Sequence, residues 1–174
     1  MAKVKSSHSN RGLDFEDIIK KKADAYKKDG RAYIYKIPTE FSIIRNGARI
    51  VSAFPKQKSI CDFIGTLQCG QAITVEAKSV ASSVTSFPFA NIGDHQFEFF
   101  KVWEQCGGLG YYLIWFKEID KCYLITSEKM QETKDTIGRK SIPLAWFSDI
   151  GNATEVIDFE FIEHIEKNYK KRVS

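Results

Sequence analysis

Residues 59–78, SICDFIGTLQCGQAITVEAK, contain two β-prone runs on either side of the polar turn Gln68–Gly70. Side chains of a strand alternate between its two faces, so the even-numbered residues of the second run share one face. These residues are Thr74, Glu76 and Lys78. Antiparallel pairing through the turn would bring Asp62, from the first run, beside Glu76. The stretch therefore predicts a strand pair that gathers two carboxylates and a lysine.

Two converging carboxylates need a cation between them, and hard oxygen ligands suit Mg²⁺. A lysine next to such an ion can place or deprotonate a water, or stabilise the charged transition state of phosphoryl transfer. A Glu-x-Lys pattern on a strand is also a common surface ion pair. On spacing alone, the site formed by Asp62, Glu76 and Lys78 is either a metal-dependent catalytic site or an ordinary surface arrangement.

A second hairpin is predicted upstream, where Phe41–Arg45 and Ala48–Phe54 flank Asn46-Gly47. Asn-Gly is favoured in a type I′ turn, because both central residues of that turn need a positive φ. Arg45 and Arg49 lie beside the tip, and the arms carry apolar β-branched residues. The hairpin either extends the main sheet and buries these arms, or projects from the fold as a stalk. Because two arginines flank the turn, we expect it to project.

The rest of the chain alternates helical and strand-like patterns. Helices are expected at 10–29, 93–106 and 158–170, with a short one after Ser127, and strands at 32–37, 109–119 and 121–126. Strands framed by helices indicate an α/β fold with a mixed central β-sheet flanked by helices. We expect a single domain over residues 1–174, in which 1–9 form a flexible basic N-terminus and 38–56 form the stalk hairpin.

Composition limits the class of protein. The 174 residues are 43% hydrophobic and 28% charged, which suits one folded core and excludes wholesale disorder. The sequence has no apolar run long enough for a membrane span and no apolar N-terminal leader, so a cytoplasmic protein without membrane partners is expected. Residues 1–60 carry 14 Lys and Arg against 6 Asp and Glu, whereas residues 61–174 carry 12 against 16. The basic N-terminal third is either a solvated surface or a footprint for phosphates.

Asp followed by Glu-x-Lys across a hairpin resembles the PD-(D/E)xK nuclease superfamily, and six short segments in register resemble the RecU family of Holliday junction resolvases. The segments are Asn10–Glu16, Asp62–Gly65, Glu76–Lys78, Ser86–Pro88, Asp94–Gln96 and Gly138–Ile142. The resemblance covers most of the chain. It implies a restriction-endonuclease-like core and a homodimeric, Mg²⁺-dependent endonuclease that resolves four-way DNA junctions by paired symmetric nicks during recombination and repair.

The resemblance also implies roles for individual residues. The implied metal ligands, for Mg²⁺ or alternatively Mn²⁺, are Asp62, Glu76, Gln96 and the backbone carbonyl of Ala77. Lys78 would stabilise the transition state, and Glu16 would support the site from the first helix. One departure is Cys61, which stands where the family usually has Thr. A hydroxyl contact from that position to the metal is therefore lost.

Junction DNA is the partner that the resemblance implies, and a recombinase is a further one. The expected DNA contacts are seven basic residues: Arg11, Arg45, Arg49, Lys56, Lys58, Arg139 and Lys140. The protein would act in the cytoplasm of a bacterium, encoded by the cell or by a phage. Two alternatives remain open at this point: a nuclease of the same superfamily with another DNA substrate, in restriction or phage DNA processing, and a catalytically silent junction-binding module.

Overall fold

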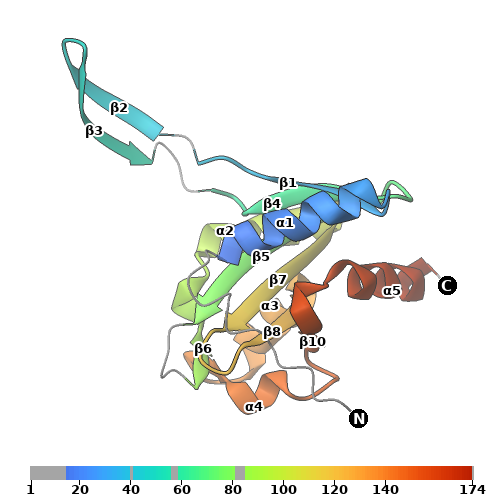
Figure 1. The fold of residues 1–174 in the computed structure, drawn as a ribbon. Helices are drawn as coiled ribbons and strands as arrows, with labels where there is room; N and C mark the ends of the chain where they lie inside the picture. The colour runs from blue at the N-terminus through green and yellow to red at the C-terminus, as the bar shows by residue number, and fades with distance from the viewer. Residues whose placement is uncertain (1–14, 40, 56–58, 81–84, 174) are drawn as a thin grey trace.

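The computed structural model describes residues 15–39, 41–55, 59–80 and 85–173. Its centre is a six-stranded sheet in the order β1-β4-β5-β7-β8-β10 (Figure 1). The strands are β1 (Ala32–Lys36), β4 (Phe63–Leu67), β5 (Ala72–Val80), β7 (Leu109–Phe116), β8 (Lys121–Thr126) and β10 (Thr154–Val156). Strands β5 and β7 run parallel, and the other neighbours run antiparallel. The predicted mixed sheet flanked by helices is confirmed.

Helices cover both faces of the sheet (Figure 1). Helices α1 (Phe15–Lys28) and α5 (Ile162–Val173) lie on one face, and α2 (Asp94–Gln105) and α3 (Ser127–Thr136) lie on the other. All eight residues of β7 are buried, as expected for a strand enclosed on both sides. Within the described ranges, no helix is long and apolar enough to cross a membrane.

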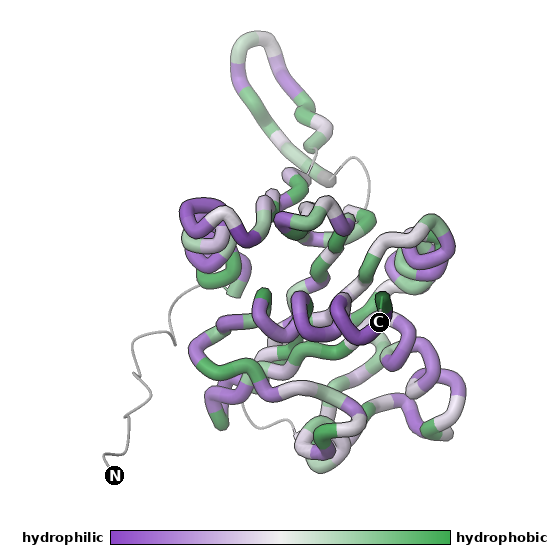
Figure 2. Tube along the Cα trace, turned by 90° about the vertical axis from the view of Figure 1, so that its right-hand side faces the viewer, coloured by the Kyte–Doolittle hydropathy of each residue, from purple (hydrophilic) through white to green (hydrophobic). Residues whose placement is uncertain are grey.

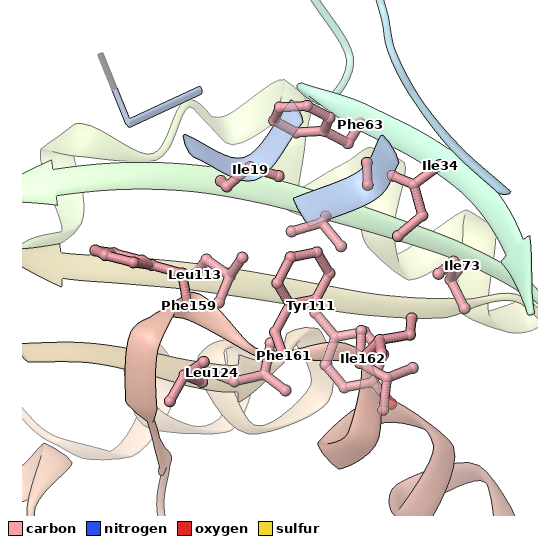
Figure 3. Close-up of a cluster of buried hydrophobic side chains, with 14 of the residues drawn as sticks. Ile19, Ile34, Phe63, Ile73, Tyr111, Leu113, Leu124, Phe159, Phe161 and Ile162 are labelled. Atoms are coloured by element: carbon pink, nitrogen blue, oxygen red, sulfur yellow. The ribbon is translucent and has the colours of Figure 1, made fainter. Parts of the chain in front are cut away.

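The first helix packs as its apolar spacing predicts. Its buried residues are Phe15, Ile18, Ile19, Ala23 and Tyr26, which recur at helical intervals along one stripe. Figure 3 shows Ile19 above the sheet, in the same cluster as Ile34 and Phe63. This packing holds α1 against β1, the strand that leads into the projecting hairpin, and against β5.

The predicted stalk hairpin consists of β2 (Phe41–Asn46) and β3 (Arg49–Pro55), which pair only with each other. It projects away from the central sheet (Figure 1), and apolar segments alternate with polar ones along it (Figure 2). Its β-branched residues are half exposed: Ile43 48%, Ile44 50%, Ile50 53% and Val51 55%. The alternative in which the hairpin extends the main sheet and buries these side chains is therefore wrong.

The turn of this hairpin differs from the predicted one. Asn46 pairs with Arg49, so the two turn residues are Gly47 and Ala48 rather than Asn46 and Gly47. Only Gly47 has a positive φ, of 60°, which matches a type II′ turn with Gly at its first central position. The ladder also shifts register between Ile44 and Arg45, where Ile44 pairs with Ser52 and Arg45 with Ile50.

The remaining differences come from long-range pairing and from the core. Strand β5 continues to Val80, beyond the predicted Lys78, because it pairs with β7 from Ile73 to its end. The elements that were not predicted are three short strands, one short helix and two 3₁₀ turns: β6 (Ser86–Pro88), β9 (Ser141–Pro143), β10, α4 (Leu144–Phe147), Phe89–Asn91 and Ile157–Phe159. The last helix begins at Ile162 rather than 158, since Asp158 and Phe159 have positive φ. The predicted helix start at Asn10 lies outside the described residues.

Candidate active site

The register of β4 and β5 brings the two predicted carboxylates together. Phe63 faces Val75, so Asp62, just before β4, is level with Glu76. The backbone N–H of Asp62 donates to Glu76 Oε2 at 3.1 Å, and the N–H of Ala77 donates to Asp62 Oδ2 at 2.9 Å. These reciprocal bonds hold each carboxylate against the other strand's backbone. The tight turn that permits this register includes Gly70, which has a φ of 86°.

Glu76 is almost completely buried, with 1% of its surface exposed. Its Oε1 lies 2.6 Å from Lys78 Nζ, and Gln96 Nε2 donates to the same oxygen at 2.5 Å. Glu76 and Lys78 therefore lie on one face of β5, as alternation predicts, and Gln96 of α2 reaches the same face. Burial, and next the charge of Asp62, raises the pKa of Glu76 to about 7, although Lys78 and Gln96 act in the opposite direction.

The residues fit a divalent cation. Two adjacent carboxylates whose charge is incompletely balanced by one lysine favour a cation between them, and the carbonyl of Ala77 lies on the neighbouring peptide. No group of three or more His, Cys, Asp or Glu side chains gathers around a common point in the part of the chain that the structure describes. This donor set suits Mg²⁺, which is commonly held by one or two carboxylates together with water and substrate phosphates.

Gln96 connects the start of α2 to the sheet. Its Oε1 accepts a hydrogen bond from the N–H of Gly93 at 3.0 Å, which caps the helix, while its Nε2 donates to Glu76. The amide therefore contacts Glu76 through its nitrogen and the helix end through its oxygen. The N-terminus of α2, where the helix dipole favours negative charge, is thereby fixed next to the carboxylates.

Cys61, the departure from the family pattern, is a packed side chain. It is fully buried, and its Sγ donates to the carbonyl of Phe63 at 3.6 Å. Burial raises the pKa of its thiol to about 11, so the thiolate is disfavoured. The preceding segment is tied to α2, because a ring nitrogen of His95 lies 3.3 Å from the carbonyl oxygen of Ser59. These contacts fix the backbone that carries Asp62.

Glu16 lies at the border of the site. Its Oε2 is 2.7 Å from Lys36 Nζ, and Lys36 faces Phe63 in the sheet, one residue from Asp62. Glu16 therefore connects α1 to the strand beside Asp62 through a lysine. Lys36 was absent from the residues predicted for the site. Nothing in its local sequence separates it from other lysines, because its position depends on the register of β1 against β4.

The predicted DNA contacts fall into two exposed groups. Arg45 and Arg49 lie at the tip of the hairpin, and Arg139 and Lys140 lie in the loop before β9. This loop is anchored beside the entry to α2, where the N–H of Phe89 donates to the carbonyl of Lys140 at 3.1 Å. The other three, Arg11, Lys56 and Lys58, lie outside the described residues.

The chain resembles proteins of known name. The model of the RecU family, described as Recombination protein U, matches residues 10–168. Holliday junction resolvase RecU of Pediococcus pentosaceus is 31% identical over 157 residues, which cover 85% of this chain and 77% of that protein. The protein of that name from Oceanobacillus iheyensis is 32% identical over 167 residues, covering 91% and 83%. The one from Bacillus licheniformis is 35% identical over 147 residues, covering 79% and 72%.

Proposed function

Because this chain belongs to the RecU family, we propose that it is a Mg²⁺-dependent endonuclease that resolves four-way DNA junctions. The observation that carries the proposal is the convergence of Asp62, Glu76 and Lys78 on one face of the sheet. Two carboxylates and one lysine at this spacing suit metal-assisted phosphodiester hydrolysis. The names of the similar proteins support a four-way junction as the substrate.

Each site residue has a role in this proposal. Asp62, Glu76 and the carbonyl of Ala77 would hold the ion, and a bound Mg²⁺ lowers the pKa of its water and neutralises phosphate charge. Lys78 stabilises the charge that develops on the phosphoryl oxygens during attack by water. Gln96, the further ligand that the resemblance implies, also orients Glu76 by a direct hydrogen bond from its Nε2, while its Oε1 accepts from the N–H of Gly93. Attack at phosphorus breaks the P–O3′ bond and leaves a 5′-phosphate and a 3′-hydroxyl.

The hairpin supports a homodimer. Its two strands form a separate sheet with half-exposed apolar side chains on both arms, including Ile43, Ile50 and Phe54. An isolated two-stranded hairpin is only marginally stable in water, so a second copy that covers these side chains would stabilise it. A twofold axis would then present two sites to two strands and produce paired nicks. Arg45 and Arg49 would contact phosphates at the centre of the junction without reading bases.

The test is cleavage of a labelled mobile junction, a linear duplex and a single strand, with Mg²⁺ and with a chelator. We expect Mg²⁺-dependent cleavage of the junction by paired nicks and little cleavage of the other two. Asp62→Asn should abolish cleavage and keep junction binding, since only the ion is lost. The matched control Glu132→Gln, on the exposed side of α3, should cleave as the wild type does.

Each alternative has its own outcome in the same assay. Equal cleavage of duplex and junction would indicate a nuclease with another DNA substrate. Junction binding without cleavage in either Mg²⁺ or Mn²⁺ would indicate a silent junction-binding module. Cleavage by Asp62→Asn at the wild-type rate would show that the metal site is elsewhere. A recombinase partner stays a prediction of the family resemblance.

A further inference from the structure

In the described part of the chain, no helix packs over the β1 end of the sheet face that carries the candidate active site. On β7, Tyr112 packs under α2, with ring centroids 6.3 Å from Phe97 and 4.7 Å from Phe100. On β1, by contrast, Tyr33 and Tyr35 expose 51% and 55% of their surfaces. They alternate with Ala32 and Ile34, which are buried toward α1. Both tyrosines are on the edge strand of the sheet, and by alternation they start from the face opposite the one that packs on α1.

The strand register places Tyr35 one row away from Asp62 and Glu76 of the candidate active site. Tyr35 faces Ile64 across β1 and β4, and Ile64 faces Thr74 on β5. In the adjacent row, the N–H of Ile37 donates to the carbonyl of Asp62 at 2.8 Å. Side chains two residues apart on a strand share a face, so Tyr35 and Asp62 belong to neighbouring rows of one face.

The stalk hairpin is rooted at the same place. The chain leaves the sheet after Lys36, forms β2 and β3, and returns to it at Asp62 (Figure 1). The hairpin is thus inserted between the strand that carries Tyr35 and the residue that carries the first catalytic carboxylate. A DNA junction centred on the hairpin would have its branch-point nucleotides close to Tyr35.

Stacking chemistry distinguishes a branch point from a duplex. Bases inside a duplex have both faces covered by their neighbours, whereas a base displaced at a branch point offers a free face. Aromatic side chains bind such free faces with little regard to sequence. We propose that Tyr35 stacks on a nucleotide unstacked at the branch point beside the scissile phosphate, and so selects junctions over duplex. This inference rests on the proposed function.

Tyr33 provides a matched control on the same strand and face. It is one row further from Asp62, and Lys27 Nζ already lies 5.1 Å above its ring centroid. Both tyrosines are exposed to a similar extent, so replacing either by Ala removes a similar surface from solvent and little from the core. A specific stack requires Tyr35 alone, whereas a general contact of this face with DNA would involve both.

The experiment measures junction and duplex affinity of the full chain in an Asp62→Asn background, with Tyr35→Ala, Tyr35→Phe, Tyr35→Leu and Tyr33→Ala. Junctions carry 2-aminopurine beside the cleaved phosphate, since the emission of this base is quenched by stacking. Tyr35→Ala and Tyr35→Leu should weaken junction binding roughly 5- to 150-fold, the scale of one lost base–aromatic stack, and raise the emission. Tyr35→Phe and Tyr33→Ala should match the parent, and duplex affinity should stay constant.

Several results would overturn the inference. Junction affinity of Tyr35→Ala within twofold of the parent would exclude a stack, as would unchanged 2-aminopurine emission. Equal losses for Tyr33→Ala and Tyr35→Ala on both DNAs would indicate a general contact. A weaker dimer in Tyr35→Ala, seen by sedimentation, would assign the face to a second copy. If the Asp62→Asn parent itself shows no preference for junctions, the proposed function fails instead, independently of Tyr35.

Discussion

Replacing Glu76 by Gln should make the metal-free protein gain stability relative to the wild type as the pH rises, although it removes a central residue of the site. Glu76 is 1% exposed, and burial together with the charge of Asp62 raises its pKa from 4.5 to about 7. At about 1.4 kcal/mol per pH unit, the ionised side chain costs the fold about 3 kcal/mol above pH 7. The raised pKa already includes the attraction of Lys78, so the loss of that ion pair is part of this figure.

The effect has a defined pH dependence. The folded carboxyl binds its proton more tightly than the unfolded one, so between pH 4.5 and about 7 the native state holds more protons. The wild-type protein therefore loses stability relative to Glu76→Gln as the pH rises through this window. Both oxygens of Glu76 accept from donors, so the amide NH₂ of Glu76→Gln faces one of them at every pH, which costs about 1–3 kcal/mol. Beyond this constant cost, the difference in free energy of unfolding should shift by about 3 kcal/mol in favour of Glu76→Gln as the pH rises from 4.5 to above 7.

Urea unfolding at pH 4.5 and pH 8, first with a chelator and then with Mg²⁺, measures this difference. Mg²⁺ should stabilise the wild type, by about 2.7 kcal/mol at a hundred times its Kd, and leave Glu76→Gln almost unchanged. Glu132→Gln, whose side chain is exposed, should behave as the wild type does at both pH values. A stability difference between Glu76→Gln and the wild type that is the same at pH 4.5 and pH 8, or equal stabilisation of both by Mg²⁺, would refute the reasoning.

Three further predictions concern the site, the hairpin and the core. Lys78→Met should lower the single-turnover cleavage rate by about 100-fold or more and leave junction affinity unchanged, because that is the scale for removing one charge partner of the transition state. A loss confined to affinity would instead make Lys78 a plain phosphate contact. Replacing Arg45–Arg49 by a Gly-Ser turn should weaken junction binding in gel shifts far more than duplex binding, and equal losses would contradict its role. Tyr26→Phe should lower the free energy of unfolding, measured in urea, by about 1–3 kcal/mol. The reason is that the buried N–H of Phe161, which donates to the Tyr26 hydroxyl at 3.2 Å, loses its acceptor. An unchanged free energy of unfolding would count against this role.

The predicted site residues differ in how far the sequence could place them. Asp62, Glu76 and Lys78 follow from the alternation of one strand and one short turn, which are local features. Gln96 came from the family resemblance alone, since no local pattern brings residues twenty positions apart into contact. Lys36 and the neighbouring Glu16 depend on how α1 and β1 pack against β4. Sequence reasoning therefore found the two-strand centre of the site and missed part of its border.

By itself, the sequence determined those helices and strands whose spacing of apolar and polar residues shows which side is buried. The apolar stripe of α1, the apolar run of β7 and the β-prone arms of the hairpin each occur within one segment. Tertiary structure alone decided which segments meet. Strand β6 pairs with β9, more than fifty residues away, and the last helix begins only at Ile162. Periodicity records only which side of an element is buried, whereas partners, register and uncovered faces such as that of Tyr35 depend on the packing of the whole chain.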